Sequence, residues 1–61
     1  MNHKFEEGQW VIDTRKEIAP TVVAHLESNV VTLYVLEDET GDYYITKEDN
    51  LIPYDKHYFD E

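Results

Sequence analysis

The stretch from residue 20 to residue 46 constrains the fold more than any other part of the chain. It contains three segments rich in β-branched and aromatic residues, which favour strands over helices. These segments are residues 21–26, 30–36 and 43–46. An acidic turn at residues 37–42 separates the last two, and Gly41 supplies the backbone freedom that a tight turn requires. The stretch therefore predicts a three-stranded antiparallel meander, around which the rest of the chain closes.

Alternation along these segments assigns their side chains to two faces of the predicted sheet. Residues 30–36 carry one purely apolar face, which we expect to form the core. That face consists of Val31, Leu33 and Val35. The opposite face includes Tyr34, is mixed in character and should be half exposed. In the preceding segment, the same alternation places Val22, Ala24 and Leu26 together on one face.

Shorter elements flank the meander on its N-terminal side. Residues 10–12 are consecutive strand formers, which predicts a strand that is covered on both faces. A polar connection at residues 14–20 is expected to be an open loop, with Pro20 at the entrance of the next strand. A single helical turn over residues 14–18, capped by Thr14, is the alternative.

The C-terminal part of the chain predicts one turn and one short strand. Residues 46–50 carry a capping pattern but are too few for a stable α-helix, so a single 3₁₀ turn is expected. Residues 51–54 form the last strand, which Pro53 confines to a sheet edge or to its own end. Short strands separated by regular turns predict a small all-β barrel or sandwich.

The order of these features resembles that of SH3-like barrels, in which a 3₁₀ turn separates the last two strands. The resemblance covers about residues 5–54. It implies a small five-stranded SH3-like barrel with one 3₁₀ turn before the last strand, in a single domain spanning residues 1–61. Residues 55–61 are then a tail that we expect to fray. Proline-rich peptide binding does not carry over, because the Ala-Leu-Tyr-Asp-Tyr motif of true SH3 domains is missing here.

Three short segments resemble a narrower family, the YorP-type SH3-like proteins of Bacillus prophages. The segments are His25-Leu26-x-Ser28, Asp38-Glu39-Thr40-Gly41-Asp42 and Lys47-Glu48-x-x-Leu51-x-Pro53. This resemblance implies a phage or mobile-element origin, and it implies no activity.

Length and charge limit the classes of function. Sixty-one residues without cysteine make one domain that no disulfide stabilises. No apolar run is long enough to span a membrane, and we expect a soluble, cytoplasmic protein. Fourteen acidic residues against five basic ones give a formal charge of −9, which disfavours nucleic-acid binding and favours a basic protein partner. Alternatively, the charge serves solubility alone.

The chain shows no pattern typical of a metal, cofactor or catalytic site. His3, His25 and His57 have none of the short spacings that zinc sites use, so we expect no metal and no cofactor. The acidic turn lacks the twelve-residue frame of a calcium loop. No cysteine nucleophile, nucleophile elbow or glycine-rich phosphate loop is present, and the chain is therefore not expected to be an enzyme.

Aromatic residues beside acids favour protein binding, since tyrosine and tryptophan suit interfaces and their rings attract cations. We expect Trp10 and Tyr43 in the core and Tyr34, Tyr44 and Tyr54 at the surface. Alternatively, the rings only fill the small core and cover its edges. The predicted binding face consists of Tyr34, Tyr44 and Tyr54 with Glu37, Asp38, Glu39 and Asp42. This face would dock on a protein partner with a basic surface, and the chain itself is expected to be a monomer or a weak dimer. Two alternatives stay open, an acidic mimic of nucleic acid that inhibits a DNA-binding protein, and a structural or assembly component.

Overall fold

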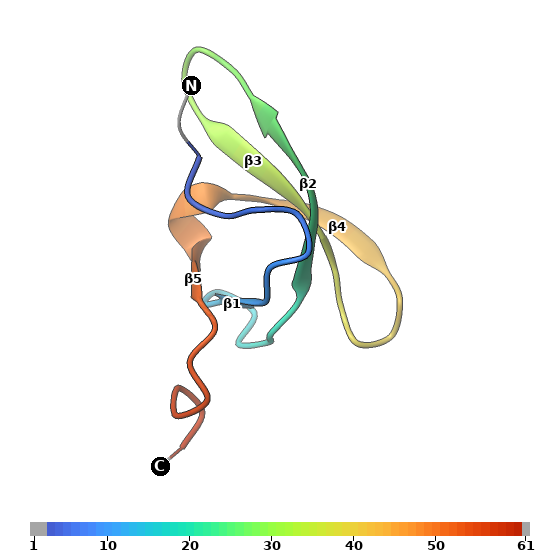
Figure 1. Cartoon of the computed structure of the whole chain (residues 1–61), viewed down its shortest axis with the longest axis vertical. Helices are drawn as coiled ribbons and strands as arrows, with labels where there is room; N and C mark the ends of the chain where they lie inside the picture. Colours follow the sequence, from blue (N-terminus) through green and yellow to red (C-terminus); the bar gives the residue numbers. More distant parts are fainter. Residues whose placement is uncertain (1–2, 61) are drawn as a thin grey trace.

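Over residues 3–60, five strands and one 3₁₀ helix follow one another (Figure 1). They are β1 (Val11–Asp13), β2 (Thr21–Glu27), β3 (Thr32–Glu37), β4 (Tyr43–Lys47), η1 (Glu48–Asn50) and β5 (Leu51–Pro53). This computed structural model describes residues 3–60. The all-β class is confirmed, and so is the 3₁₀ turn directly before the last strand.

The strands form two antiparallel sheets. One sheet has the order β2-β3-β4, and the other pairs β1 with β5. Within residues 3–60 the two sheets do not close into a barrel. They are instead joined on one side, where Val11 N donates to Pro20 O over 3.1 Å and Val22 N donates to Gln9 O over 2.9 Å. The residues that enter β1 thereby run along the first residues of β2.

A β-bulge in β2 decides which of its side chains face the core. Val22 lies opposite Leu36 and Ala24 opposite Val35, so β2 has one residue more than β3 between these two pairs. The extra residue shifts the alternation by one position. Val22 is buried before the bulge, whereas Leu26 is 48% exposed after it. The prediction that Val22 and Leu26 share one face is therefore wrong.

The core lies on the other face of β3 from the one we predicted. Tyr34 and Leu36 are fully buried there, whereas Val31, Leu33 and Val35 are only half buried. The buried cluster combines Phe5, Val11, Val22, Tyr34, Leu36 and Leu51. Alternation separates the two faces of a strand but does not say which face meets the second sheet. Here β1, β5 and the residues before β1 cover the mixed face, while Lys4, Phe5 and Glu48 supply the partners of the Tyr34 hydroxyl.

The connection between β1 and β2 is a closed turn without a helix. Glu17 N donates to Asp13 O over 2.7 Å, while Asp13 Oδ1 accepts the N–H groups of Arg15 and Lys16. The bond between Glu17 and Asp13 spans four residues, as in a single turn of α-helix, and Asp13 caps this turn in place of Thr14. The connection is therefore closer to the alternative of one helical turn than to the predicted open loop, although no helix is formed. Pro20 directly precedes β2, as predicted.

Beyond β5 the chain turns once and extends away from both sheets (Figure 1). Tyr58 N donates to Asp55 O over 2.9 Å, and Asp60 N donates to His57 O over 3.1 Å. Over residues 3–60 the structure has no helix with the length and apolar character that crossing a membrane requires.

Candidate binding groove

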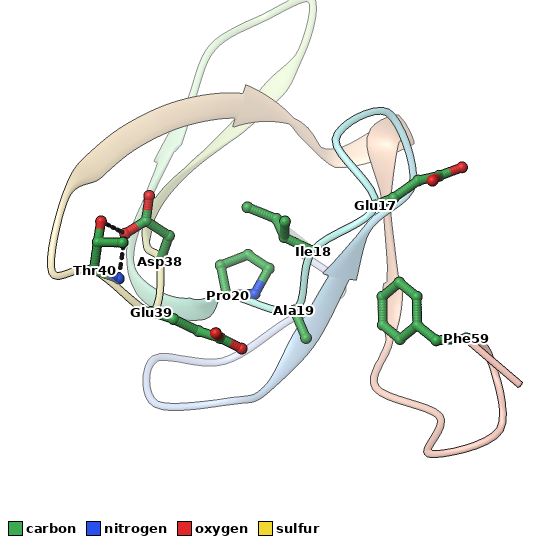
Figure 2. A pocket seen from close by; sticks show the side chains of 8 residues that line it. All are labelled: Glu17, Ile18, Ala19, Pro20, Asp38, Glu39, Thr40 and Phe59. Atoms are coloured by element: carbon green, nitrogen blue, oxygen red, sulfur yellow. Dashed lines mark hydrogen bonds between the residues drawn. The ribbon is translucent and has the colours of Figure 1, made fainter.

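An open groove of about 440 Å³ lies between the connection that precedes β2, the acidic turn and the C-terminal tail (Figure 2). Its lining combines apolar and acidic side chains. The lining residues are Glu17, Ile18, Ala19, Pro20, Asp38, Glu39, Thr40 and Phe59. Among these described residues there is no Lys or Arg. The groove therefore has an apolar floor and an acidic rim.

The backbone carbonyls of the floor accept hydrogen bonds from β1 and from the indole of Trp10, and these bonds hold the floor in place. Ile18 O accepts from Asp13 N over 2.9 Å, and Pro20 O accepts from Val11 N over 3.1 Å. Between them, Ala19 O accepts from the indole Nε1 of Trp10 over 2.9 Å. Three consecutive carbonyls are thus fixed, so the floor is held before any ligand arrives.

Asp38 organises the acidic side of the groove. Its Oδ1 accepts Thr40 Oγ1–H over 2.6 Å, Thr40 N–H over 2.9 Å and Asp42 N–H over 3.0 Å. The side-chain hydrogen bond from Thr40, followed by the backbone bonds, lowers the pKa of Asp38. Gly41 has φ of 88°, the left-handed conformation that a glycine adopts without strain. Asp38 therefore holds a negative charge at a defined place, beside the exposed Glu39.

The structure brings together only part of the predicted binding face. Asp38 and Glu39 lie on the groove rim, while Glu37 ends β3 opposite Tyr43, and Asp42 is exposed outside the lining. Contact between these four carboxylates and a partner protein stays a prediction.

The predicted placement of the aromatic rings is largely wrong. Tyr34 is fully buried instead of lying at the surface, whereas Trp10 is 51% and Tyr43 is 65% exposed instead of lying in the core. Tyr54 stacks on Trp10 with ring centroids 3.9 Å apart and planes 1° from parallel. Tyr44 is half buried against the core cluster. The three predicted contact tyrosines therefore do not form one surface.

Tyr34 connects three parts of the chain through its hydroxyl. The oxygen accepts Lys4 N–H over 3.0 Å and Phe5 N–H over 3.2 Å, and the hydroxyl donates to Glu48 Oε2 over 2.6 Å. Burial and the bond to Glu48 raise the pKa of Tyr34. Burial opposes ionisation of Glu48, but hydrogen bonds from Tyr34 and Lys4 outweigh it and lower the pKa of this carboxyl.

Asp13 and Tyr44 form a second internal network. Asp13 is 1% exposed, and its Oδ2 accepts the Tyr44 hydroxyl over 2.8 Å while Oδ1 caps the turn. Burial, followed by the bond to Asp13, raises the pKa of Tyr44. Lys16 Nζ lies 3.7 Å from the centre of the Tyr44 ring, as in a cation–π contact. Both tyrosine networks are satisfied within the chain, so they stabilise the fold and aim no reactive group at the groove.

The sequence prediction missed the floor of the groove and one of its walls. Ile18, Ala19 and Pro20 are an apolar run inside a polar connection, which is a signal that could have identified them. Phe59 carries no such signal, because its place at the groove depends on how the tail turns after β5.

Comparison with models of protein families, with curated proteins and with solved structures finds no match to the chain. A function for this chain can therefore be inferred only from the geometry of the chain's own residues.

Proposed function

We propose that this chain is a non-enzymatic protein-interaction module, and that it binds a basic segment of a partner protein in the groove. The observation that carries the proposal is the combination of an apolar floor with an acidic rim. A lysine or arginine side chain has an apolar stem and a charged end. The stem would cover the partly exposed Ile18 and Ala19, while the charge would reach Asp38 and Glu39.

The charge of the whole chain supports the same kind of partner. A formal charge of −9 attracts a basic surface and speeds its encounter at low ionic strength. Charged residues on the rim of an interface act mainly on specificity and association rate. The apolar floor would then supply contact area that electrostatic attraction alone does not provide.

We further propose that the fold is SH3-like. The strand order supports this architecture, since the first and last strands pair, the middle three form a meander, and η1 precedes β5. Kinship with the Bacillus prophage family and a cytoplasmic location stay predictions.

The two alternative functions have weaker support. A mimic of nucleic acid requires carboxylates spaced like phosphates, and it does not need the apolar surface that Ile18 and Ala19 expose in the groove. A role in assembly through edge strands stays a prediction that sedimentation at two protein concentrations would test.

Binding can be tested by titrating the isotope-labelled chain with a short peptide that alternates arginine and leucine. Amide signals of residues 17–19, 38–40 and Phe59 are expected to move, because these residues line the groove. Glu39→Lys should weaken binding roughly tenfold, equivalent to about 1.4 kcal/mol. The affinity should also fall as salt is added, because exposed charges are screened.

Asp49→Lys is the matched control, because it changes the net charge equally on an exposed residue of η1 outside the groove. Equal weakening by both variants would show that only the overall charge matters, and would contradict binding in the groove. A peptide with glutamate in place of arginine should not bind. Signal changes centred on the outer sheet face at Tyr43 and Ile45 would also contradict the proposal.

A further inference from the structure

Two histidines that are distant in the sequence stack on each other in the fold. The rings of His3 and His25 have centroids 3.8 Å apart and planes inclined by 19°. The bulge in β2 places His25 opposite Tyr34, on the side that residues before β1 cover. The sequence spacing predicted no metal site, but the tertiary structure brings together two of the three histidines.

A carboxylate completes the cluster. Glu27 Oε2 lies 3.6 Å from His3 Nδ1 and 3.6 Å from His25 Nε2. One ligand atom from each residue can be chosen so that all three lie within 4.8 Å of one another. Two ligand atoms bound at about 2.1 Å to one tetrahedral ion are about 3.4 Å apart. The spacing of the cluster is therefore close to what a single ion requires.

His3 Nδ1 has no hydrogen-bond partner although it is buried. A buried polar atom without a partner costs roughly the desolvation free energy of that atom. The other ring nitrogen, Nε2, lies 3.6 Å from Glu6 Oε2. Histidines that bind metals commonly direct their second nitrogen at a carboxylate in this way. His3 thus presents an unpaired nitrogen toward Glu27 and directs its other nitrogen at a second carboxylate, as a metal-binding histidine does.

We propose that His3 Nδ1, His25 Nε2 and Glu27 Oε2 form a binding site for a divalent transition metal such as Zn²⁺, with a fourth position open to water. Two imidazoles and one carboxylate are a donor set that zinc uses. Mg²⁺ prefers oxygen ligands and should be rejected. Binding requires the two rings to turn out of their stack, so that their lone pairs converge on the ion.

The site also joins the N-terminal segment to the end of β2. A ligand that binds only the folded chain raises its apparent stability. Bound Zn²⁺ should therefore raise the melting temperature of the wild-type chain, and this effect does not depend on the groove.

Calorimetric titration of the full chain with Zn²⁺ tests the proposal. We expect one ion per chain, and a loss of affinity of at least tenfold in His3→Ala and in His25→Ala. His57→Ala is the matched control, because His57 also faces a carboxylate, with Nδ1 2.9 Å from Asp60 Oδ2, but lies in the exposed tail. Its affinity should stay that of the wild type.

Circular dichroism checks that each variant is folded. His3 lies outside every strand, so His3→Ala decides the outcome if His25→Ala disturbs β2. Nitrogen resonances of the His3 and His25 rings should move on addition of Zn²⁺. The proposal is overturned if the wild type does not bind Zn²⁺, if His3→Ala binds as tightly as the wild type, or if binding depends on His57.

Discussion

Two tyrosine hydroxyls hold distant parts of this small chain together. Tyr34 reaches the backbone of residues 4–5 and the side chain of Glu48, while Tyr44 reaches the buried carboxylate of Asp13. A buried polar atom is stabilising only when it has a partner. Each hydroxyl thus satisfies groups that the fold has removed from water, in addition to the packing of its ring.

Tyr34→Phe should lower the free energy of unfolding by about 1–3 kcal/mol, because it leaves the buried Phe5 N–H without its partner. Urea unfolding followed by tryptophan fluorescence measures the change. Tyr43→Phe is the matched control, since Tyr43 is 65% exposed and should tolerate the same change within about 0.5 kcal/mol. Similar losses in the two variants would argue against the role assigned to the Tyr34 hydroxyl.

Alkaline pH should weaken the fold through Tyr44. Its pKa is raised in the folded chain above the ordinary value of 10.0, so the folded state holds the phenol proton more tightly than the unfolded state does. The resulting stability is fully present below pH 10 and is lost as the pH rises through the folded pKa. The raised pKa of Tyr34 acts in the same direction.

Urea midpoints measured between about pH 9 and pH 12 should therefore fall for the wild type. Tyr44→Phe should show a shallower fall, because one of the two phenols with a raised pKa has been removed. Parallel curves for the wild type and the variant would rule out a contribution from Tyr44.

At the scale of elements, one inserted residue in β2 has effects on both sides of the three-stranded sheet. The bulge turns Leu26 outward and places His25 opposite Tyr34. The outer face therefore carries exposed apolar side chains from β2 and β4, including Ile45, which is 56% exposed. The inner face gains the histidine of the proposed metal site.

Two identical substitutions in β3 test which of its faces is the core. Leu36→Ala should cost about 2–5 kcal/mol of unfolding free energy, because Leu36 is fully buried and its truncation leaves a cavity. Leu33→Ala removes the same atoms from a half-buried position on the outer face and should cost about 1 kcal/mol or less. A larger loss of unfolding free energy in Leu33→Ala than in Leu36→Ala would contradict this assignment and favour the core face that alternation alone predicted.

At the scale of the whole molecule, sites form where segments from different parts of the chain meet. The groove needs the connection before β2, the acidic turn and Phe59 of the tail. The histidine cluster needs the residues before β1 and the end of β2. A chain of 61 residues has a small core, so both sites lie between peripheral segments instead of inside a deep cavity.

Much of the fold could be predicted from local patterns. The five strands and the 3₁₀ turn occur in the predicted order, because strand propensity, turn residues and Pro20 each act over a few neighbouring residues. For the candidate site, only the acidic rim at Asp38 and Glu39 was identified. The floor was missed because its apolar run was interpreted only as a connection between strands.

The sequence by itself determined the all-β class, the order of the elements and the acidic character, since these depend on composition and on short-range backbone preferences. Only the tertiary structure decided which face of β3 is buried, where the aromatic rings lie, and that His3 meets His25. The physical reason is that burial is set by what packs on a face. The bulge reversed the alternation in β2, and the second sheet covered the face on which Tyr34 finds its hydrogen-bond partners.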